Sequence, residues 1–145
     1  AHLGTAFLIL GVGIVSTFSI EREIILQKGE SYKLGSANFI FKQIQESRRL
    51  NYTIQSADVE LRDGRLTDQI IVEKRNYLSS NQVMTEAAIK PTFLQDYYVT
   101  LGDQVGDGAW SFKLQIKPFI RWIWFGAILI ALGAFVSTYR QVKRL

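Results

Sequence analysis

The stretch "SFKLQIKPFIRWIWFGAILIALGAFVSTY", residues 111–139, changes its hydrophobic pattern at a single proline, Pro118. Before this proline, apolar and polar residues alternate with the period of a half-buried β-strand. After it, residues 122–139 contain no charge, and as a helix these 18 residues would span about 27 Å, close to the roughly 30 Å hydrocarbon core of a bilayer. The stretch therefore predicts a β domain that runs directly into a transmembrane helix.

A second uncharged run lies near the start of the chain, at residues 3–20, and it has the same length. Two such runs predict an integral membrane protein with two transmembrane helices that flank an all-β domain. The expected domains are a transmembrane helix at 1–20, an extracytoplasmic β domain at 21–117, a transmembrane helix at 118–139 and a basic tail at 140–145.

The distribution of charge predicts the side of the membrane on which each part lies. All 13 acidic residues lie between Glu21 and Asp107, and residues 21–117 are neutral overall. The net charge of +4 comes from four basic residues beyond them, namely Arg121, Arg140, Lys143 and Arg144. Basic residues that flank a membrane helix tend to stay in the cytoplasm, so the tail is expected inside and the β domain outside. This topology explains the net positive charge of the chain, so no nucleic-acid partner is needed to account for it.

Between the two apolar runs, the sequence consists of short alternating segments rich in Ile, Val, Tyr, Phe and Thr. The Asp63-Gly64 pair is a strong hairpin signal. Six or seven short strands joined by turns favour a small antiparallel sandwich or barrel. The expected strands are 22–28, 31–34, 38–46, 51–62, 68–78, 96–104 and 110–118, whereas 79–91 is expected to be a loop with a helical turn.

The residue types present restrict the possible chemistry. The chain has one histidine and no cysteine, so it carries no disulfide, thiolate metal site or Ser-His-Asp set. Asp58 and Glu60 share a strand face close to Arg62, and residues 73–75 form a charge run. We expect these groups to be solvated rather than catalytic.

The one histidine, His2, lies at the start of the first apolar run. An ionisable group in a membrane helix usually faces a bundle interior or a cofactor, and neutral imidazole is a common ligand of haem iron. The alternative is an interfacial residue at a helix end. Small residues recur on this helix at Gly4, Gly11 and Ser16, where either another helix or a flat macrocycle could approach the backbone.

At the other apolar run, Arg121 lies about one turn into the expected helix, next to Trp122 and Trp124. A long arginine stem can reach the lipid headgroups from this position, beside an interfacial belt of tryptophan. Arg121 is therefore expected to mark the outer boundary of the membrane.

Seven sequence blocks, in order, resemble the C-terminal part of the cytochrome c-type biogenesis protein CcmF family. They are "AHLG" at 1, "NY" at 51, "EKRNY" at 73, "MTEAAI" at 84, "DYYVTLGD" at 96, "DGAW" at 107 and "KPFIRWIWFG" at 117. The chain departs from the family pattern at Val72, where a proline often precedes the "EKR" block. It also begins without methionine, within what reads as a helix, so we expect a fragment of a longer membrane protein or a processed chain.

The resemblance implies a role in a membrane haem lyase of bacterial, or mitochondrial, inner membranes. In such a system, a covalent haem chaperone delivers haem, which is joined to the CxxCH thiols of apocytochrome c. Thiol-handling and apocytochrome-presenting subunits complete the system, and quinol is a candidate electron source. The resemblance further implies that His2 is one axial ligand of a b-type haem whose second ligand lies outside this chain. The segment is then not catalytic alone.

Within the β domain, the resembling blocks imply a structural or docking cluster. Its members are Glu73, Lys74, Arg75, Tyr77, Thr85 and Glu86, with Arg121 at the membrane boundary. The alternative function is a non-catalytic two-helix membrane module whose β domain binds or scaffolds partner proteins.

Overall fold

A computed structural model describes residues 2–143, so Arg144 and Leu145 of the expected basic tail lie outside the described residues. The chain divides into two compact units. The helical unit comprises Ala1–Ser19, Pro91–Asp96 and Lys117–Leu145, and the β unit comprises Ile20–Lys90 and Tyr97–Ile116.

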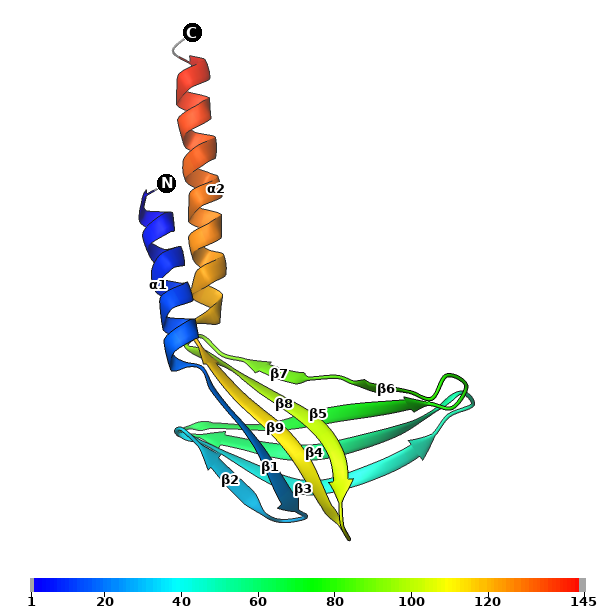
Figure 1. Cartoon of the computed structure of the whole chain (residues 1–145). Helices are drawn as coiled ribbons and strands as arrows, with labels where there is room; N and C mark the ends of the chain where they lie inside the picture. The colour runs from blue at the N-terminus through cyan, green and yellow to red at the C-terminus, as the bar shows by residue number, and fades with distance from the viewer. Residues whose placement is uncertain (1, 144–145) are drawn as a thin grey trace. The chain divides into compact units, whose positions relative to one another are not determined.

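The helical unit is built from α1 (His2–Phe18) and α2 (Ile120–Lys143), which pack against each other through glycine (Figure 1). A Cβ added to Gly4 would lie 2.7 Å from the backbone nitrogen of Ile130, and one added to Gly126 would lie 2.7 Å from that of Leu8. Both positions therefore require the absence of a side chain, because the two backbones approach closely. The small residues Gly4 and Gly11 thus serve helix packing rather than leaving room for a macrocycle.

Of the two helices in residues 2–143, α2 has the dimensions of a membrane span. Within it, 20 residues, Ile120–Tyr139, are long and apolar enough to cross a bilayer by length and composition. Helix α1 is apolar over 17 residues, which is shorter than that criterion. The prediction of a second membrane-spanning helix at residues 1–20 therefore stays a prediction.

The β unit is an antiparallel sandwich of two sheets, as the alternating pattern predicts (Figure 1). One sheet has the strand order β1-β9-β8-β7 and the other β2-β3-β4-β5-β6. The strands are β1 (Ile20–Gln27), β2 (Ser31–Leu34), β3 (Ala37–Arg48), β4 (Tyr52–Asp63), β5 (Leu66–Tyr77), β6 (Gln82–Thr85), β7 (Ala88–Pro91), β8 (Gln95–Val105) and β9 (Ala109–Pro118).

The core of the sandwich is formed by alternate residues of both sheets. Phe41 on β3 packs against Phe112 on β9 with ring centroids 4.9 Å apart, and both side chains are fully buried. Val59, Leu61 and Val72 contribute from the other long strands. This inward set is the reason that the sequence alternates, because every second residue of a strand points to the same face.

Each of the seven expected strands is present, and the Asp63-Gly64 pair forms the β4–β5 hairpin, with Gly64 at a φ of +57°. The expectation of a loop with a helical turn at 79–91 is wrong, because this segment forms β6 and β7. All four residues of β6 are exposed. A strand without a buried face gives no alternation of apolar residues, so its pattern did not identify it.

The five-stranded sheet is covered over only part of its length. Along β3, residues 37, 39 and 41 are buried, and then a bulge at Lys42 shifts the pairing from Phe41↔Val59 to Gln43↔Asp58. Beyond the bulge, no residue of β3 is buried. We call this uncovered part of the sheet, residues 43–56 and 73–85, the free end.

Candidate functional site

The residues of the expected docking cluster come together at the free end of the five-stranded sheet. Strand β6 pairs with β5 so that Thr85 lies opposite Lys74, and Met84 lies opposite Arg75. The chain then continues to Glu86, whose backbone N–H donates to the carbonyl of Glu73 at 3.1 Å. The six side chains therefore occupy one hydrogen-bonded pair of strands, although they are up to 13 positions apart in the sequence.

Arg75 lies at the centre of the outer face of this cluster. Its Nη2 donates to Glu73 at 3.1 Å, and its Nη1 lies 3.5 Å from a carboxylate oxygen of Glu86. The hydrogen bond to Glu73, followed by the charge of Glu86, raises the pKa of Arg75. Tyr77 lies on the same face and packs against Tyr52 with ring centroids 5.4 Å apart. One guanidinium and two carboxylates thus form a surface with a small excess of negative charge.

Lys74 points to the opposite face and links the two sheets. Its side chain is 11% exposed, and its Nζ donates to the carbonyl of Gly102 at 3.1 Å and to Asp103 at 2.5 Å. The hydrogen bond and the charge of Lys74 lower the pKa of Asp103. The expected cluster therefore contains two different groups: Lys74 fastens the sandwich, whereas Glu73, Arg75, Tyr77 and Glu86 form a surface.

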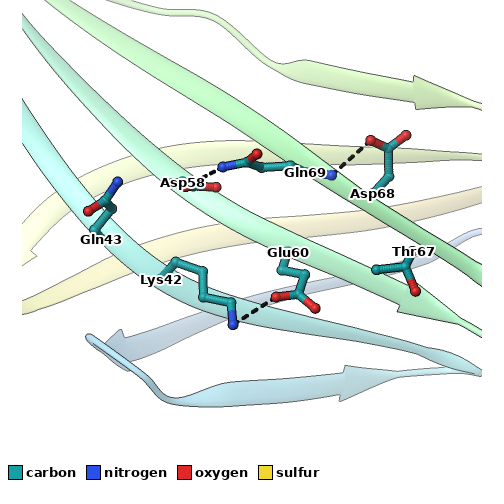
Figure 2. A pocket seen from close by; sticks show the side chains of 7 residues that line it. All are labelled: Lys42, Gln43, Asp58, Glu60, Thr67, Asp68 and Gln69. Carbon is teal, nitrogen blue, oxygen red and sulfur yellow. Dashed lines mark hydrogen bonds and ion pairs between the residues drawn. The ribbon is translucent and has the colours of Figure 1, made fainter.

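A polar groove of about 530 Å³ lies on the outer face of the same sheet, next to the bulge (Figure 2). Glu60 accepts a hydrogen bond from Lys42 at 2.7 Å and another from Arg62, and together they lower its pKa. Asp58 accepts from Gln69 at 2.5 Å through one oxygen. The groove is lined by Lys42, Gln43, Asp58, Glu60, Thr67, Asp68 and Gln69.

Of the two carboxylates, Glu60 is ion-paired with Lys42 and Arg62, whereas Asp58 is hydrogen-bonded to Gln69 and is not fully solvated. Within residues 2–143, the other carboxylate oxygen of Asp58 is buried without a hydrogen-bond partner. The groove was not predicted, because a hydrophobic pattern does not reveal the bulge that brings Lys42 beside Glu60.

Arg121 lies at the edge of an apolar pocket in the helical unit. The pocket, of about 380 Å³, is lined by Phe93, Arg121, Trp122 and Phe125. The Nε of Arg121 lies 3.8 Å from a carboxylate oxygen of Asp96, whose residue is only 7% exposed. The Asp96 carboxylate is thus a second reason for an arginine at position 121, in addition to the expected contact with lipid headgroups.

His2 is exposed on α1, and it lies on the side away from α2. Gly4 and Gly11 face α2, and a helical residue two positions before Gly4 lies nearly opposite to it. Gly13 shares the side of His2, and a Cβ added there would meet no atom within 4 Å. The described part of the chain contains no group of three metal-ligating side chains. His2 thus offers one imidazole nitrogen on an open helix face. This arrangement could supply a single ligand to haem iron.

These features define a class: an antiparallel β-sandwich enclosed in sequence by two apolar helices. The family model described as the CcmF C-terminal beta-sandwich matches residues 17–118. The chain belongs to the CcmF family.

Individual relatives agree with this assignment. The cytochrome c-type biogenesis protein CcmF of Haemophilus influenzae is 37% identical over 99% of this chain, and that of Pseudomonas fluorescens is 40% identical over 94%. The chain covers 22% and 21% of these two relatives, or about a fifth of their length. A solved structure titled "Cytochrome c Heme Lyase CcmF" has the same fold, with a TM-score of 0.73 and 18% identity over 92% of this chain and 23% of that chain.

Proposed function

We propose that this chain is the C-terminal part of a membrane cytochrome c haem lyase. In this proposal, α1 supplies one axial ligand of a b-type haem, and the β unit forms part of the platform where haem is joined to apocytochrome c. Membership of the CcmF family supports the general role. The observation that carries the specific role is the position of His2 on an open face of α1, opposite the glycines that pack on α2.

His2 provides one neutral imidazole nitrogen with an unshared electron pair, which is the donor that haem iron accepts. When bound, b-type haem supplies one-electron redox chemistry, and quinol is the proposed electron source. Gly4 and Gly11 fix α1 against α2 and so hold the imidazole at a set height along the helix pair. The second axial ligand belongs to a part of the protein beyond this chain.

The β unit is proposed to lie on the extracytoplasmic side of the bacterial or mitochondrial inner membrane, with α2 as its anchor. Arg121 and Trp122 would then lie at the lipid headgroups, where an arginine and an aromatic belt are favourable. The proposed partners of the platform are the covalent haem chaperone, apocytochrome c, and the thiol-handling and apocytochrome-presenting subunits.

The haem role is tested in the full-length parent protein with His2→Ala. Purified protein should lose the b-type signal in reduced-minus-oxidised absorption spectra. Thr17→Ala is the matched control, because Thr17 is also exposed on α1 and should leave the signal intact. A b-type signal that is the same in both variants would exclude His2 as a ligand.

The second candidate is a non-catalytic membrane module whose β unit scaffolds partner proteins. The observation in its favour is that Arg75 is ion-paired with both Glu73 and Glu86, so these charged groups bind one another. A photo-crosslinker at Tyr77 distinguishes the two. Capture of apocytochrome c supports the platform, whereas capture of only other parts of the same protein supports a structural role.

A further inference from the structure

We propose that the outer edge of β6 is a strand-addition site that binds an extended segment of apocytochrome c by backbone hydrogen bonds. The inference rests on the proposed function for the identity of the partner, and on the geometry of the edge for the mode of binding. An unpaired strand edge presents N–H and C=O groups whose natural complement is another extended backbone.

The four edge strands of the sandwich differ in how they are protected. Edge strands usually carry charges or proline, which prevent pairing with another chain. Strand β1 carries Glu21, Arg22 and Glu23, β2 carries Lys33, and β7 carries Lys90 and Pro91. Strand β6, with the sequence QVMT, has neither charge nor proline. Of the four edges in the described sheets, β6 alone lacks these features, so it is the edge that accepts a strand.

The direction of the β6 backbone identifies the groups that are free. The N–H of Glu86 points to β5, because it donates to the carbonyl of Glu73 at 3.1 Å. Successive residues of a strand point their N–H groups to opposite sides, so Met84 also faces β5, while Val83 and Thr85 face away from it. The described sheet has no strand beyond β6. Val83 and Thr85 therefore present two N–H and two C=O groups to an incoming chain.

The side chains of the edge indicate what kind of segment fits. Val83 is 55% exposed and Met84 is 50% exposed, so an added strand with apolar side chains would cover apolar surface on both faces. Next to them, Glu73 and Glu86 share the single guanidinium of Arg75. This excess of negative charge favours a basic side chain in the partner near Glu86. The expected ligand is thus an unfolded, largely apolar segment with a basic residue at one end.

The site is tested with the full-length parent protein and a synthetic peptide that spans the CxxCH segment of an apocytochrome c. Val83→Pro removes an outward N–H and leaves the β5–β6 ladder intact, because proline is tolerated on the free side of an edge strand. We expect it to weaken peptide binding about tenfold, through a lost hydrogen bond and the bulk of the ring. Val83→Ala keeps the N–H and is the matched control, with an expected change of about twofold or less.

A second arm leaves the protein unchanged. The same peptide, methylated on alternate backbone nitrogens, loses its donors on one edge, and it should bind about tenfold more weakly than the unmodified peptide. If both arms leave affinity unchanged while the peptide still binds, the edge proposal is overturned and the haem-lyase role stands. If the peptide binds neither the wild type nor the variants, this inference also fails, and the b-type haem spectrum then decides separately whether the haem function survives.

Discussion

The covered part of the five-stranded sheet and its free end are built from the same three long strands, but their inward residues differ. Under the opposite sheet, β3, β4 and β5 present Phe41, Ala57 and Val72. At the free end, the inward positions are Ile44, Gln55 and Lys74, none of which is fully buried. The comparison teaches that the covered part supplies most of the buried core of the sheet, whereas the free end contributes much less to it.

Phe41→Ala, in the covered part, should lower the free energy of unfolding more than any other substitution proposed below. Removing a fully buried aromatic ring that packs on Phe112 leaves a cavity, and such substitutions cost about 3–5 kcal/mol. Urea unfolding of the protein measures the loss. Ile44→Ala, just past the bulge, is the control and should cost about 1 kcal/mol, because this side chain is only partly buried. Equal losses for the two variants would contradict the division of the sheet.

Lys74→Met should weaken the contact that Lys74 makes with the opposite sheet. The change keeps the apolar stem but removes the donor to the Gly102 carbonyl, at a cost of about 1 kcal/mol. Asp103→Ala should cost less than Lys74→Met, since the bond to Gly102 remains and Asp103 is exposed. Thermal unfolding compares the two variants. A larger effect of Asp103→Ala would show that the ion pair, rather than the bond to the carbonyl, fastens the sheets.

Acid should affect both parts through three carboxylates. The pKa values of Glu60, Asp68 and Asp103 are lowered by hydrogen bonds from Lys42, Lys90 and Lys74, in that order. A group whose pKa is lower in the folded state stabilises the fold above its ordinary pKa and loses that effect as the pH falls. The stability should therefore decline below about pH 4.5, the ordinary value for Glu60. Melting curves from pH 7 to pH 3 test this.

Glu60→Gln is the control for the acid prediction, because it cannot titrate and keeps the size of the side chain. Its melting temperature should fall less steeply with acid than that of the wild type. A parallel decline in both proteins would mean that other groups dominate the acid response.

Arg75→Gln should have the smallest effect on stability, because its ion pairs lie on an exposed face and such pairs contribute little. Its expected consequence is in partner contact, since Glu73 and Glu86 would lose the cation that they share. Crosslinking yields from position 77 in the full-length parent, alongside the melting temperature, separate the two effects. A large drop in melting temperature would place Arg75 among the stabilising residues instead.

Local sequence signals predicted most of the sandwich. The alternation at Phe112, Leu114 and Ile116 and the turn at Asp63-Gly64 act within a few residues, so they can be read directly from the chain. Strands β6 and β7 were missed because each has only four residues and none of these residues is fully buried, so neither strand shows a clear apolar face.

The structure brings the residues of the predicted cluster near one another but on two faces of the sheet, and their structural or docking role stays a prediction. Strand alternation alone would have placed Lys74 opposite Glu73 and Arg75. The partner of Lys74, Asp103, belongs to the other sheet, and no local pattern connects two residues 29 positions apart. The same limit hid Asp96 as the partner of Arg121.

The bulge at Lys42 also determines which residues of β3 face the core, and so which one-residue deletions the strand can tolerate. Odd-numbered residues of β3 face the core before the bulge, and an even-numbered one, Ile44, faces inward after it. The extra residue thus shifts the phase of the strand by one. Deleting Lys42 would give an unbroken ladder in which Gln43 still pairs with Asp58 and Ile44 still faces inward, and the sheet would lose only the bulge and the Lys42–Glu60 ion pair. A one-residue deletion at the bulge should therefore be better tolerated than one farther along the strand, where each later side chain would turn to the other face.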